Sequence, residues 1–250
     1  MVEVICVVPV APLRAEDSHR AEMVSQILFG ETAHVISETK DFYQIQMRQD
    51  GYKGWCQKLQ LQLVTEGANI STTGYTYNWV NHAVFNGQPI QLPLGIPIVS
   101  YASSDFELIY TGPRLDLAEN VNAPDALENL AKQFLGTAYL WGGRSVFGID
   151  CSGFVQLVFK LLNVRLPRDA YQQAEMGEAI DFLAEAKLGD LAFFDNEQGK
   201  ITHVGILLSP HQIIHASAVV RIDPIDQAGI VSSTTGLRTH QLRTIRRIAL

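Results

Sequence analysis

The 250-residue sequence has few cysteines, no long apolar run and no excess of positive charge. Its three cysteines, Cys6, Cys56 and Cys151, are an odd number at wide spacing, which excludes a disulfide framework and a CxxC metal knuckle. No stretch approaches the roughly 20 consecutive apolar residues that a membrane-spanning helix needs. Basic residues number 19 against 26 acidic ones, a formal charge of −7. The chain as a whole therefore has no electrostatic attraction to nucleic acid or anionic lipid.

The rest of the composition is that of a globular protein, with 47% apolar and 18% charged residues. The N-terminal segment carries Glu3 where a signal peptide needs positive charge, and prolines at 9 and 12 interrupt its apolar run. We therefore expect a cytoplasmic protein with no nucleic-acid or membrane partner. The local exception to the acidic charge is a group of arginines that we interpret as the polar face of a last strand: Arg238, Arg243, Arg246 and Arg247.

The first half of the sequence has the pattern of short β-strands. Apolar and polar residues alternate over 34–38 and 43–47, and residues 51–55 (GYKGW) are typical of a tight turn. Residues 21–29 fit either a helix or a strand. The polar segment 65–75 indicates a linker, and prolines at 89, 93, 97 and 113 exclude a long helix after it. These lengths predict two small β-barrels of roughly 50–60 residues each.

The second half of the sequence predicts helices followed by antiparallel strands, an α+β layout. A helix is expected to start at 122–125 and to end at Gly136. Apolar residues at helical spacing predict a buried helix over 150–163, and a second helical segment is expected at about 169–184. Strands are then expected over 190–194, 201–208, 212–217, 219–224 and 241–248.

Cys151 is the candidate nucleophile. It stands in residues 148–153 (GIDCSG), at the predicted start of the buried helix. The partial positive charge and the free N–H groups of a helix start favour the thiolate, which is the nucleophilic form of cysteine. A small apolar residue packed at a helix start is the alternative interpretation. Cys6 and Cys56 lie in apolar strand patterns, where we expect core packing.

Two histidines lie in predicted strands on either side of a short turn. His203 stands in 201–206 (ITHVGI), and His215 stands in 213–217 (IIHAS). If these strands pair antiparallel, the two imidazoles lie nearly opposite each other, so that His203 could act as a general base oriented by His215. Two core histidines are one alternative. A zinc site with Cys151 is another, but neither a fourth ligand nor an HxxxH spacing supports it. The remaining histidines give no comparable signal: His19, His34, His82, His211 and His240.

The order of six short segments resembles the NlpC/p60 family of papain-like cysteine peptidases. The segments are 140–143 (LWGG), 150–155 (DCSGFV), 166–169 (LPRD), 189–194 (GDLAFF), 202–206 (THVGI) and 214–217 (IHAS). The resemblance covers about residues 123–248 and implies Cys151 as nucleophile, His203 as base and His215 as the third, polar member. It also implies cleavage of peptidoglycan peptides, commonly at the γ-D-glutamyl–diamino acid bond, with no cofactor and no metal.

The first half resembles the bacterial SH3-like domains that precede this catalytic domain in the branch acting on small, released muropeptides. The resemblance implies SH3-like β-barrels over 1–64 and 65–118 and a catalytic domain over 119–250. In that branch an acidic residue and a tyrosine of the first barrel, with the aspartate before the nucleophile, hold the free amino group of an N-terminal L-alanine. The matching positions are Glu31, Tyr52 and Asp150. A cationic amine in a closed pocket needs such a carboxylate, because an unpaired buried charge is unfavourable. The alternative for Glu31 is a solvated turn residue, and the alternative for Tyr52 is a half-buried aromatic of the barrel.

The resemblance also assigns residues around the scissile bond. Tyr139 matches the family tyrosine that lines the oxyanion side of the active site. Ser152 could supply its own backbone N–H and its hydroxyl to the same site. Arg168 and Asp169 match the substrate-side loop, where Arg168 could bind the α-carboxylate of D-glutamate. Core packing for Tyr139 and a solvated loop position for Arg168 are the alternatives. Ala170 departs from the pattern, because relatives often carry serine there, and this puts one substrate hydrogen bond in doubt.

The expected function is thus cleavage of L-Ala-γ-D-Glu-diamino acid peptides in muropeptide recycling. An amidase or acyltransferase acting through the same Cys-His-His site is one alternative. A cell-wall binding module of SH3 type, with an inert cysteine domain, is another. The sequence does not distinguish diaminopimelate from lysine as the diamino acid.

Overall fold

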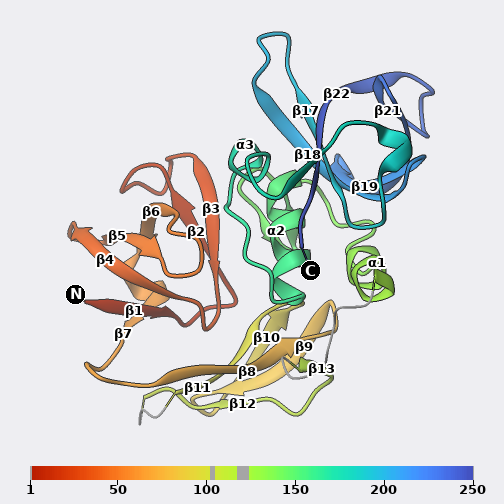
Figure 1. Ribbon diagram of the computed structural model, residues 1–250. Helices are drawn as coiled ribbons and strands as arrows, with labels where there is room; N and C mark the ends of the chain where they lie inside the picture. Colours follow the sequence, from red (N-terminus) through yellow and green to blue (C-terminus); the bar gives the residue numbers. More distant parts are fainter. Residues whose placement is uncertain (1, 102–104, 117–123, 250) are drawn as a thin grey trace. The chain divides into compact units, whose positions relative to one another are not determined.

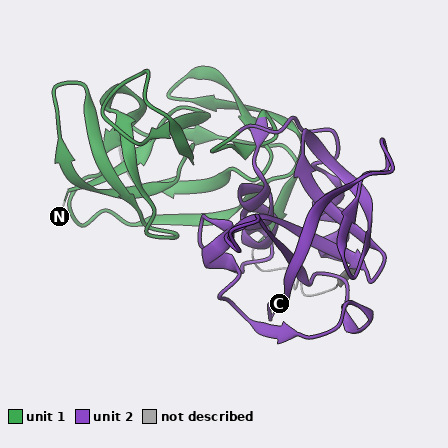
Figure 2. Ribbon diagram, turned by 90° about the horizontal axis from the view of Figure 1, so that it is seen from above, with its two compact units in different colours: residues 1–120, 141–147 green, residues 121–140, 148–250 purple. Residues whose placement is uncertain are grey.

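The computed structural model describes residues 2–101, 105–116 and 124–249. The chain forms two compact units (Figure 2). Unit 1 contains residues 1–120 and 141–147, and unit 2 contains residues 121–140 and 148–250. Among the described residues, unit 1 consists mainly of strands, whereas unit 2 combines α-helices with a sheet (Figure 1).

The larger sheet of unit 1 has seven strands in the order β3-β2-β6-β5-β4-β1-β7. They are β1 (Glu3–Cys6), β2 (Val10–Arg14), β3 (Met23–Leu28), β4 (Thr32–Glu38), β5 (Phe42–Met47), β6 (Lys53–Gln57) and β7 (Leu61–Leu63), with a 3-10 turn η1 (Lys58–Gln60) before β7. The paired strands are antiparallel, with Val4 opposite Ala33 and Tyr43 opposite Cys56. The side chains on one face form an apolar core that includes both Cys6 and Cys56, as expected from their strand patterns.

The rest of unit 1 forms two three-stranded sheets, β10-β9-β12 and β11-β8-β13. Their strands are β8 (Ile70–Thr76), β9 (Val80–Phe85), β10 (Gln88–Pro93), β11 (Pro97–Tyr101), β12 (Leu108–Ile109) and β13 (Arg114–Asp116); the short strand β14 (Arg144–Ser145) also belongs to this unit. The ring of Phe29 lies 5.0 Å from that of Phe85 and 5.7 Å from that of Phe106. These aromatic contacts belong to one apolar core that joins the seven-stranded sheet to the two three-stranded sheets.

The helices of unit 2 are α1 (Pro124–Lys132), α2 (Cys151–Leu161) and α3 (Ala170–Gln173), with a 3-10 turn η2 (Leu183–Glu185). Helix α2 is buried along nearly its whole length, as its apolar circumference predicts, and it packs on β18 and β19. Gly136, at φ +84°, follows α1 and lets the chain reverse in a left-handed conformation. The first two residues of the predicted helix start, 122 and 123, lie outside the described residues.

The sheet of unit 2 has the order β16-β22-β17-β18-β19-β20-β21, and an additional pairing of β21 with β22 closes it into a barrel. Its strands are β16 (Glu178–Ile180), β17 (Leu191–Asp195), β18 (Ile201–Ser209), β19 (Gln212–Ser217), β20 (Val219–Asp226), β21 (Gly229–Val231) and β22 (Arg238–Arg247); the short β15 (Gly148–Ile149) precedes α2. The strands predicted after residue 190 are therefore confirmed, and so is the α+β layout.

The helical segment expected over 169–184 is wrong in its extent. Only Ala170–Gln173 is helical, and the chain then forms β16 and η2. Gly177 ends the helical region at φ +68°, and a Cβ at this position would clash with the carbonyl oxygen of Arg247. Pairing of β16 with β22 therefore overrides the local helical pattern. The ambiguous segment 21–29 is resolved as strand β3.

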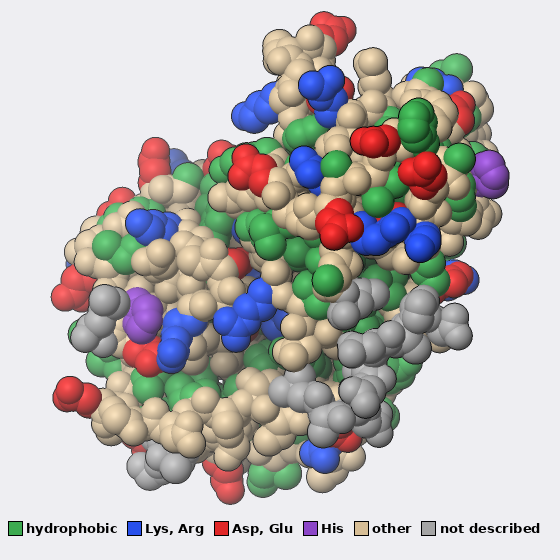
Figure 3. Space-filling model, in the orientation of Figure 1, with side chains coloured by type: hydrophobic (Ala, Val, Ile, Leu, Met, Phe, Trp, Pro, Cys, Tyr) green, Lys and Arg blue, Asp and Glu red, His purple; other side chains and the backbone are tan. Residues whose placement is uncertain are grey.

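The surface and the helix lengths agree with the charge and hydropathy of the sequence. On the face shown in Figure 3, acidic and basic side chains are interspersed, and the described residues seen there form no continuous basic surface. Within the described part of the chain, none of the helices combines the length and the apolar character that a bilayer crossing requires.

Candidate active site

Cys151 is the first residue of α2, and Asp150 before it is the helix N-cap. Asp150 has an extended backbone (φ −92°, ψ 176°), and its Oδ1 accepts a hydrogen bond from the Gly153 N–H at 2.7 Å. This bond satisfies one of the N–H groups that a helix start leaves free. The sequence therefore builds the predicted helix start, and the cysteine stands in its first turn.

Arg168 holds this helix start from a neighbouring loop. Its Nη1 lies 3.0 Å from Asp150 Oδ1 and 2.9 Å from Ser152 Oγ, and its Nη2 lies 2.5 Å from Asp150 Oδ2. Arg168 is only 2% exposed, so this is a buried, bidentate ion pair. The contacts position the turn that carries the nucleophile. A bond from Arg168 to a substrate carboxylate stays a prediction.

Helix α3 adds a second support for the same turn. Gln173 Nε2 donates to the carbonyl oxygen of Ser152 at 3.1 Å and to that of Pro167 at 2.9 Å. Asp169 is the N-cap of α3, and its N–H donates to Gln172 Oε1 at 3.4 Å. Asp169 thus lies at the start of the element that packs beside the nucleophile, while its contact with substrate stays a prediction.

The Cys151 side chain is buried, with 5% exposure, and lies against the backbone of β18. Burial, and then the neighbouring Asp150 carboxylate, raise the pKa of the thiol to about 12; hydrogen bonds from the backbone of Val204 and Ser152 act in the opposite direction. At neutral pH the resting residue is therefore a thiol. The helix start favours the thiolate, as the sequence suggests, but burial outweighs it, so the proton has to leave during attack.

The two predicted histidines begin a chain of buried hydrogen bonds. His203 Nε2 lies 2.8 Å from His215 Nδ1, and His215 Nε2 lies 3.0 Å from Asp223 Oδ2. Asp223 is fully buried and also accepts from Arg221 Nε at 2.8 Å and from the N–H and Oγ of Ser233 at 2.9 and 2.7 Å. The chain joins β18, β19 and β20, so the antiparallel pairing expected for the two histidines is confirmed.

The order of this chain determines which nitrogen of His203 is basic. Burial alone would raise the pKa of the Asp223 carboxyl, but the hydrogen bonds from Ser233 and His215 together outweigh burial and lower it to about 2. At neutral pH the carboxylate therefore only accepts hydrogen bonds. His215 must then carry its proton on Nε2, and its Nδ1 accepts the Nε2–H of His203. Burial lowers the pKa of both imidazoles, which keeps them neutral. The remaining acceptor is His203 Nδ1.

His240 on β22 is a third imidazole at the site, which the sequence did not single out. Its ring stacks on that of His203, with centroids 4.1 Å apart and planes inclined by 25°. Burial lowers the pKa of His240 to about 4, so it too is neutral. The stack covers one face of the base and limits its rotation.

The cluster of His203, His215 and His240 also has the composition of a metal site, since one nitrogen from each lies within 4.8 Å of the others. Its geometry is that of a hydrogen-bonded pair and a ring stack. Two nitrogens on a tetrahedral zinc, at about 2.0–2.1 Å each, lie about 3.3 Å apart. The 2.8 Å between His203 and His215 is shorter than that and fits a shared proton. The residues that could hold a metal are therefore arranged for proton transfer.

Tyr139 is half-buried beside the nucleophile. Burial and the neighbouring Cys151 and Asp150 raise the pKa of its phenol to about 12, so it remains a hydrogen-bond donor at neutral pH. Its backbone is fixed by a hydrogen bond from its N–H to Ala218 O at 2.8 Å and by a bridge to Ile149. The structure thus places Tyr139 beside Cys151, and the Cys151 thiol against the backbone of Val204, the residue after His203. All four residues of the predicted catalytic group lie within unit 2.

Glu31 and Tyr52 belong to unit 1. The Glu31 carboxylate is buried and accepts from Arg144 Nη1 at 2.9 Å, from Arg144 Nη2 at 3.1 Å and from the Leu28 N–H at 2.9 Å. Tyr52 packs against the apolar core of the seven-stranded sheet, and its N–H donates to Asp50 Oδ1 at 2.9 Å. Glu31 is therefore not a solvated turn residue. Binding of a substrate amine by Glu31, Tyr52 and Asp150 stays a prediction.

Three residues of these networks escaped the sequence analysis: Asp223, His240 and Arg144. The available signal for Asp223 was a carboxylate that follows apolar residues in the strand next to that of His215. His240 and Arg144 carry no local signal, because their partners, His203 and Glu31, lie far away in the sequence.

Two family models match the chain. The model of the NlpC/P60 family matches residues 136–239, and that of the bacterial dipeptidyl-peptidase SH3 domain matches residues 13–61. The first range contains Tyr139, Cys151, His203, His215 and Asp223, whereas His240 follows it directly.

Similar curated proteins include two γ-D-glutamyl-L-lysine dipeptidyl-peptidases. The chain is 31% identical to that of Bacillus subtilis, over 77% of this chain and 71% of the relative. It is 27% identical to that of Bacillus cereus, over 88% of this chain and 75% of the relative. A probable endopeptidase NlpC of Escherichia coli is 37% identical over 42% of this chain and 69% of that protein.

The fold is shared with a solved NlpC/P60 family protein from Bacillus cereus. That crystal structure superimposes with a TM-score of 0.73 over 99% of this chain and 100% of the other, at 20% identity. An NlpC/P60 endopeptidase from Photobacterium damselae gives a TM-score of 0.68 over 97% of this chain and 70% of the other, at 14% identity. The predicted fold class, an NlpC/p60 catalytic domain preceded by SH3-like β-structure, is thereby confirmed.

Proposed function

This chain belongs to the NlpC/P60 family and is a peptidase, and we propose that it cleaves the γ-D-glutamyl–L-diamino acid bond of short peptides derived from peptidoglycan. The observation that carries the proposal is the buried hydrogen-bond chain from His203 through His215 to Asp223. The residue after His203, Val204, contacts the Cys151 thiol at the helix start through its backbone. The names of the two dipeptidyl-peptidases support the choice of bond.

Attack begins with transfer of the Cys151 proton to His203. The raised pKa of the thiol and the lowered pKa of the imidazole make both groups neutral at rest. His203 Nδ1 is the bare nitrogen, and it takes the proton as the sulfur adds to the amide carbonyl. His215 accepts the Nε2–H of His203 throughout, and the Asp223 carboxylate stabilises the charge that develops on the imidazole pair.

The oxyanion of the tetrahedral intermediate needs donors that are in place before attack. The N–H groups at the start of α2 supply one set, because a helix start leaves them free of partners in the helix. The phenol of Tyr139 supplies another, since its raised pKa keeps its proton in place at neutral pH. The C–N bond then breaks, and His203 returns the proton to the leaving amine.

Deacylation completes the cycle with water as the second reactant. His203 Nδ1 takes a proton from water, hydroxide adds to the thioester, and the C–S bond breaks. The sulfur leaves as a thiolate and recovers its proton from His203, so that the enzyme returns to its resting state. The products are L-Ala-γ-D-Glu and a free diamino acid or shortened peptide. Glu31, Tyr52 and Asp150 are proposed to hold the free N-terminal amine of the substrate.

The decisive experiment is mass spectrometry of the protein incubated with L-Ala-γ-D-Glu-meso-diaminopimelate and, in parallel, with its N-acetylated copy. We expect release of free diaminopimelate from the first peptide alone, because acetylation removes the cationic amine. Cleavage of both peptides would support the peptidase activity but would contradict the proposed binding of the substrate amine by Glu31 and Tyr52. Cleavage of neither by the folded protein would refute the proposed substrate.

Cys151→Ala is the matched control for the nucleophile. It removes the sulfur from a site that already accepts a small side chain, so the fold should persist, and turnover should fall to background. A trapped acyl-enzyme carrying Ala-Glu supports the peptidase, whereas a fatty acyl adduct would indicate an acyltransferase. Binding to purified sacculi without turnover would indicate a binding module.

The proposed setting is the cytoplasm, where released muropeptides are recycled. The support is the proposed substrate, a short released peptide with a free N-terminal amine. Fractionation of cells that express the native gene, followed by detection of the chain, tests this setting. Recovery in the periplasm or the medium would contradict it.

A further inference from the structure

Residues 141–147 form a loop that belongs to unit 1, although the chain before and after it belongs to unit 2. The loop begins two residues after Tyr139, the proposed oxyanion donor, and ends four residues before Cys151. It is therefore the segment that connects these two members of the catalytic group along the chain.

The two ends of the loop are fixed to each other within unit 2. The Leu140 N–H donates to the carbonyl oxygen of Ile149 at 3.1 Å, and the Ile149 N–H donates to that of Ala138 at 3.0 Å. Tyr139 also forms a β-bridge with Ile149. Because these bonds hold the ends together, a displacement of the loop would shift Tyr139 and the turn before Cys151 at the same time.

Within unit 1 the loop lies on β3, the edge strand of the seven-stranded sheet. Gly142 has a left-handed backbone (φ +76°), and a Cβ at this position would come within 2.5 Å of the Met23 carbonyl oxygen. Trp141 Nε1 donates to Glu22 Oε1 at 2.6 Å. The loop thus covers a strand edge whose backbone groups are unpaired in the sheet, and its close approach to that edge requires glycine.

Arg144 anchors the middle of the loop and is only 1% exposed. Its backbone N–H donates to Gln26 Oε1 at 2.7 Å, and its Nη1 donates to the Gln26 carbonyl oxygen at 2.6 Å. Its Nη1 and Nη2 also donate to the Glu31 carboxylate at 2.9 and 3.1 Å. Breaking a buried, bidentate ion pair from one side is strongly unfavourable, so these bonds hold the loop firmly on β3.

We propose that Arg144 is a positioning residue for the nucleophile, which it fixes in place by holding the 141–147 loop on β3. The inference rests on the proposed function, because it takes Cys151 as the nucleophile and Tyr139 as the oxyanion donor. Arg144 acts through the loop and not through substrate, since its guanidinium is buried against Gln26 and Glu31. Glu31 therefore has a structural role in addition to the proposed binding of the amine.

Gly142→Ala tests the loop while both partners of the buried ion pair stay in place. The added methyl meets the Met23 carbonyl and displaces the loop from β3. We expect kcat for L-Ala-γ-D-Glu-meso-diaminopimelate to fall by roughly 10–100-fold with little change in KM, the effect of misplaced catalytic groups. Hydrogen-exchange mass spectrometry should show faster exchange over residues 149–154, where the N–H groups of Ile149, Gly153 and Phe154 are hydrogen-bonded in the wild-type protein.

Two substitutions of Arg144 test the anchor itself. Arg144→Gln should lower kcat and speed exchange over 149–154 in the same way. Arg144→Lys keeps a positive charge beside Glu31 but loses the bidentate geometry, so it should recover part of both effects. Arg144→Gln leaves the Glu31 carboxylate buried without its partner, so its thermal unfolding is measured first. If it does not fold, Gly142→Ala and Arg144→Lys decide the outcome.

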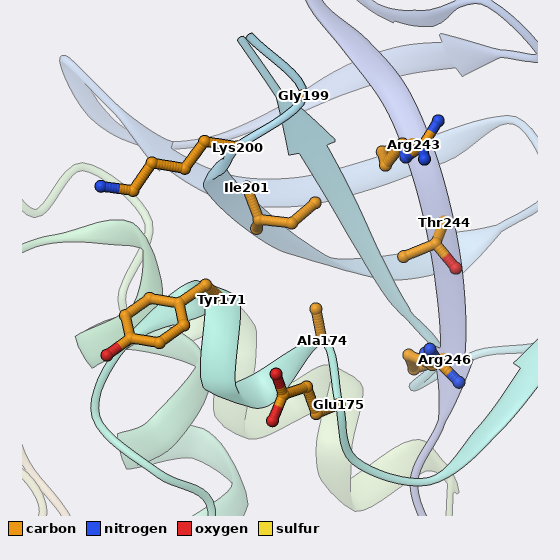
Figure 4. A pocket seen from close by; sticks show the side chains of 9 residues that line it. All are labelled: Tyr171, Ala174, Glu175, Gly199, Lys200, Ile201, Arg243, Thr244 and Arg246. Carbon is orange, nitrogen blue, oxygen red and sulfur yellow. The ribbon is translucent and has the colours of Figure 1, made fainter.

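Two arginines outside the loop supply matched controls. Arg48→Gln removes an exposed ion pair with Glu3 in unit 1. Arg243→Gln changes an exposed side chain of β22 in unit 2, at a pocket whose described lining residues include none from the loop (Figure 4). Both variants should keep the wild-type kcat and the wild-type exchange over 149–154.

Exchange that is unchanged over 149–154 in folded Gly142→Ala and Arg144→Lys would overturn the inference, whether or not kcat falls, because the loop would then not hold the turn. Hydrogen exchange needs no substrate. Failure of the wild-type protein to cleave the tripeptide would therefore refute the proposed function, while the exchange data would still decide whether Arg144 fixes the turn.

Discussion

At the scale of single residues, the site depends on where two protons lie. Asp223 is an obligatory acceptor, so it places the His215 proton on Nε2. His215 in turn places the His203 proton on Nε2 and leaves Nδ1 as the base. A carboxylate that does not touch the reacting atoms therefore determines the protonation of the residue that does.

We expect Asp223→Asn to lower kcat by roughly 10²-fold, within the range for loss of general-base catalysis. The amide of asparagine is a donor as well as an acceptor, so it allows the wrong tautomer of His215. Kinetics on the tripeptide and ¹⁵N NMR of the histidine rings provide the measurement. Arg221→Gln is the control, because Arg221 binds the same carboxylate, as His215 does, but donates its hydrogen bonds to Asp223 and Ser232 and not to an imidazole. Unchanged ¹⁵N shifts in Asp223→Asn would contradict the proton order.

We expect His240→Ala to lower kcat/KM by about 3–10-fold, in line with an aromatic contact of about 0.5–1.5 kcal/mol, and His240→Phe to retain it. In His240→Ala, water reaches the face of His203, and the imidazole pKa rises toward 6.5. The acid limb of the pH profile, which lies below pH 6.5 in the wild-type protein, should move upward in the alanine variant alone. An acid limb shared by all three proteins would show that the stack has no part in tuning the base.

At the scale of elements, three strands bring the catalytic hydrogen-bond chain together, and the spacing between two of them depends on a missing side chain. Gly205 lies on β18 two residues after His203. A Cβ there would approach His215 Cβ to 2.8 Å and Ile213 Cδ1 to 2.7 Å. The close approach of β18 and β19 at this point therefore requires glycine.

We expect Gly205→Ala to lower the free energy of unfolding by about 1–3 kcal/mol, the usual effect of overpacking, and to lower kcat because His215 is displaced. Urea unfolding and tripeptide kinetics measure the two effects. Thr202→Ala is the matched substitution on an exposed position of the same strand, and it should leave both nearly unchanged. Full activity in Gly205→Ala would mean that the strand spacing does not position His215.

The Asp150 carboxylate at the start of α2 is bound by two parts of the chain, the helix itself and a following loop. Its N-cap Asp150 satisfies a free N–H of the helix, and the same carboxylate pairs with Arg168 from the following loop. Breaking such a buried pair from one side leaves an uncompensated charge. The position of the nucleophile thus depends on residues 150–168 as a group rather than on the helix alone.

At the scale of the whole molecule, each unit has its own core and its own buried ion pair. In unit 1, Arg144 binds Glu31, and its backbone N–H also donates to Gln26 Oε1 at 2.7 Å. Residues 141–147 therefore belong to this unit although they lie between segments of the other. In unit 2, the pair of Arg168 and Asp150 has the corresponding structural role.

Titratable groups that are buried or held in ion pairs make the stability of the molecule depend on pH. Asp223 and Asp226 have pKa values lowered from 3.8 to about 2, so their contributions are complete above pH 3.8 and are lost as pH falls toward 2. The pKa of His240 is lowered from 6.5 to about 4, so the unfolded chain binds the extra proton first below pH 6.5. Both effects lower stability as pH falls.

We therefore expect urea midpoints to decrease from pH 7 to pH 4 and to decrease further between pH 4 and pH 2. His240→Phe removes one group that titrates between pH 7 and pH 4, so the midpoint should depend less on pH in that interval. Asp223→Asn should reduce the pH dependence of the midpoint between pH 4 and pH 2. A wild-type midpoint that is constant from pH 7 to pH 4 would contradict neutral burial of the imidazoles.

The sequence by itself determined the local part of this protein. Short motifs identified Cys151 at a helix start and His203 and His215 in adjacent strands, because an N-cap, an apolar helix and alternating strands all leave periodic signals. The strand pattern of the first half and the α+β order of the second half were predictable for the same reason.

Only the tertiary structure decided the contacts between residues distant in the sequence. Asp223, His240 and Arg144 acquire their roles from strand pairing and packing, which leave no local pattern. The short α3 is a further example, since Gly177 and the pairing of β16 with β22 overrode a helical sequence. Burial also reversed the expected effect of the helix start on Cys151, because desolvation of the thiolate is a property of the packed molecule and not of the local chain.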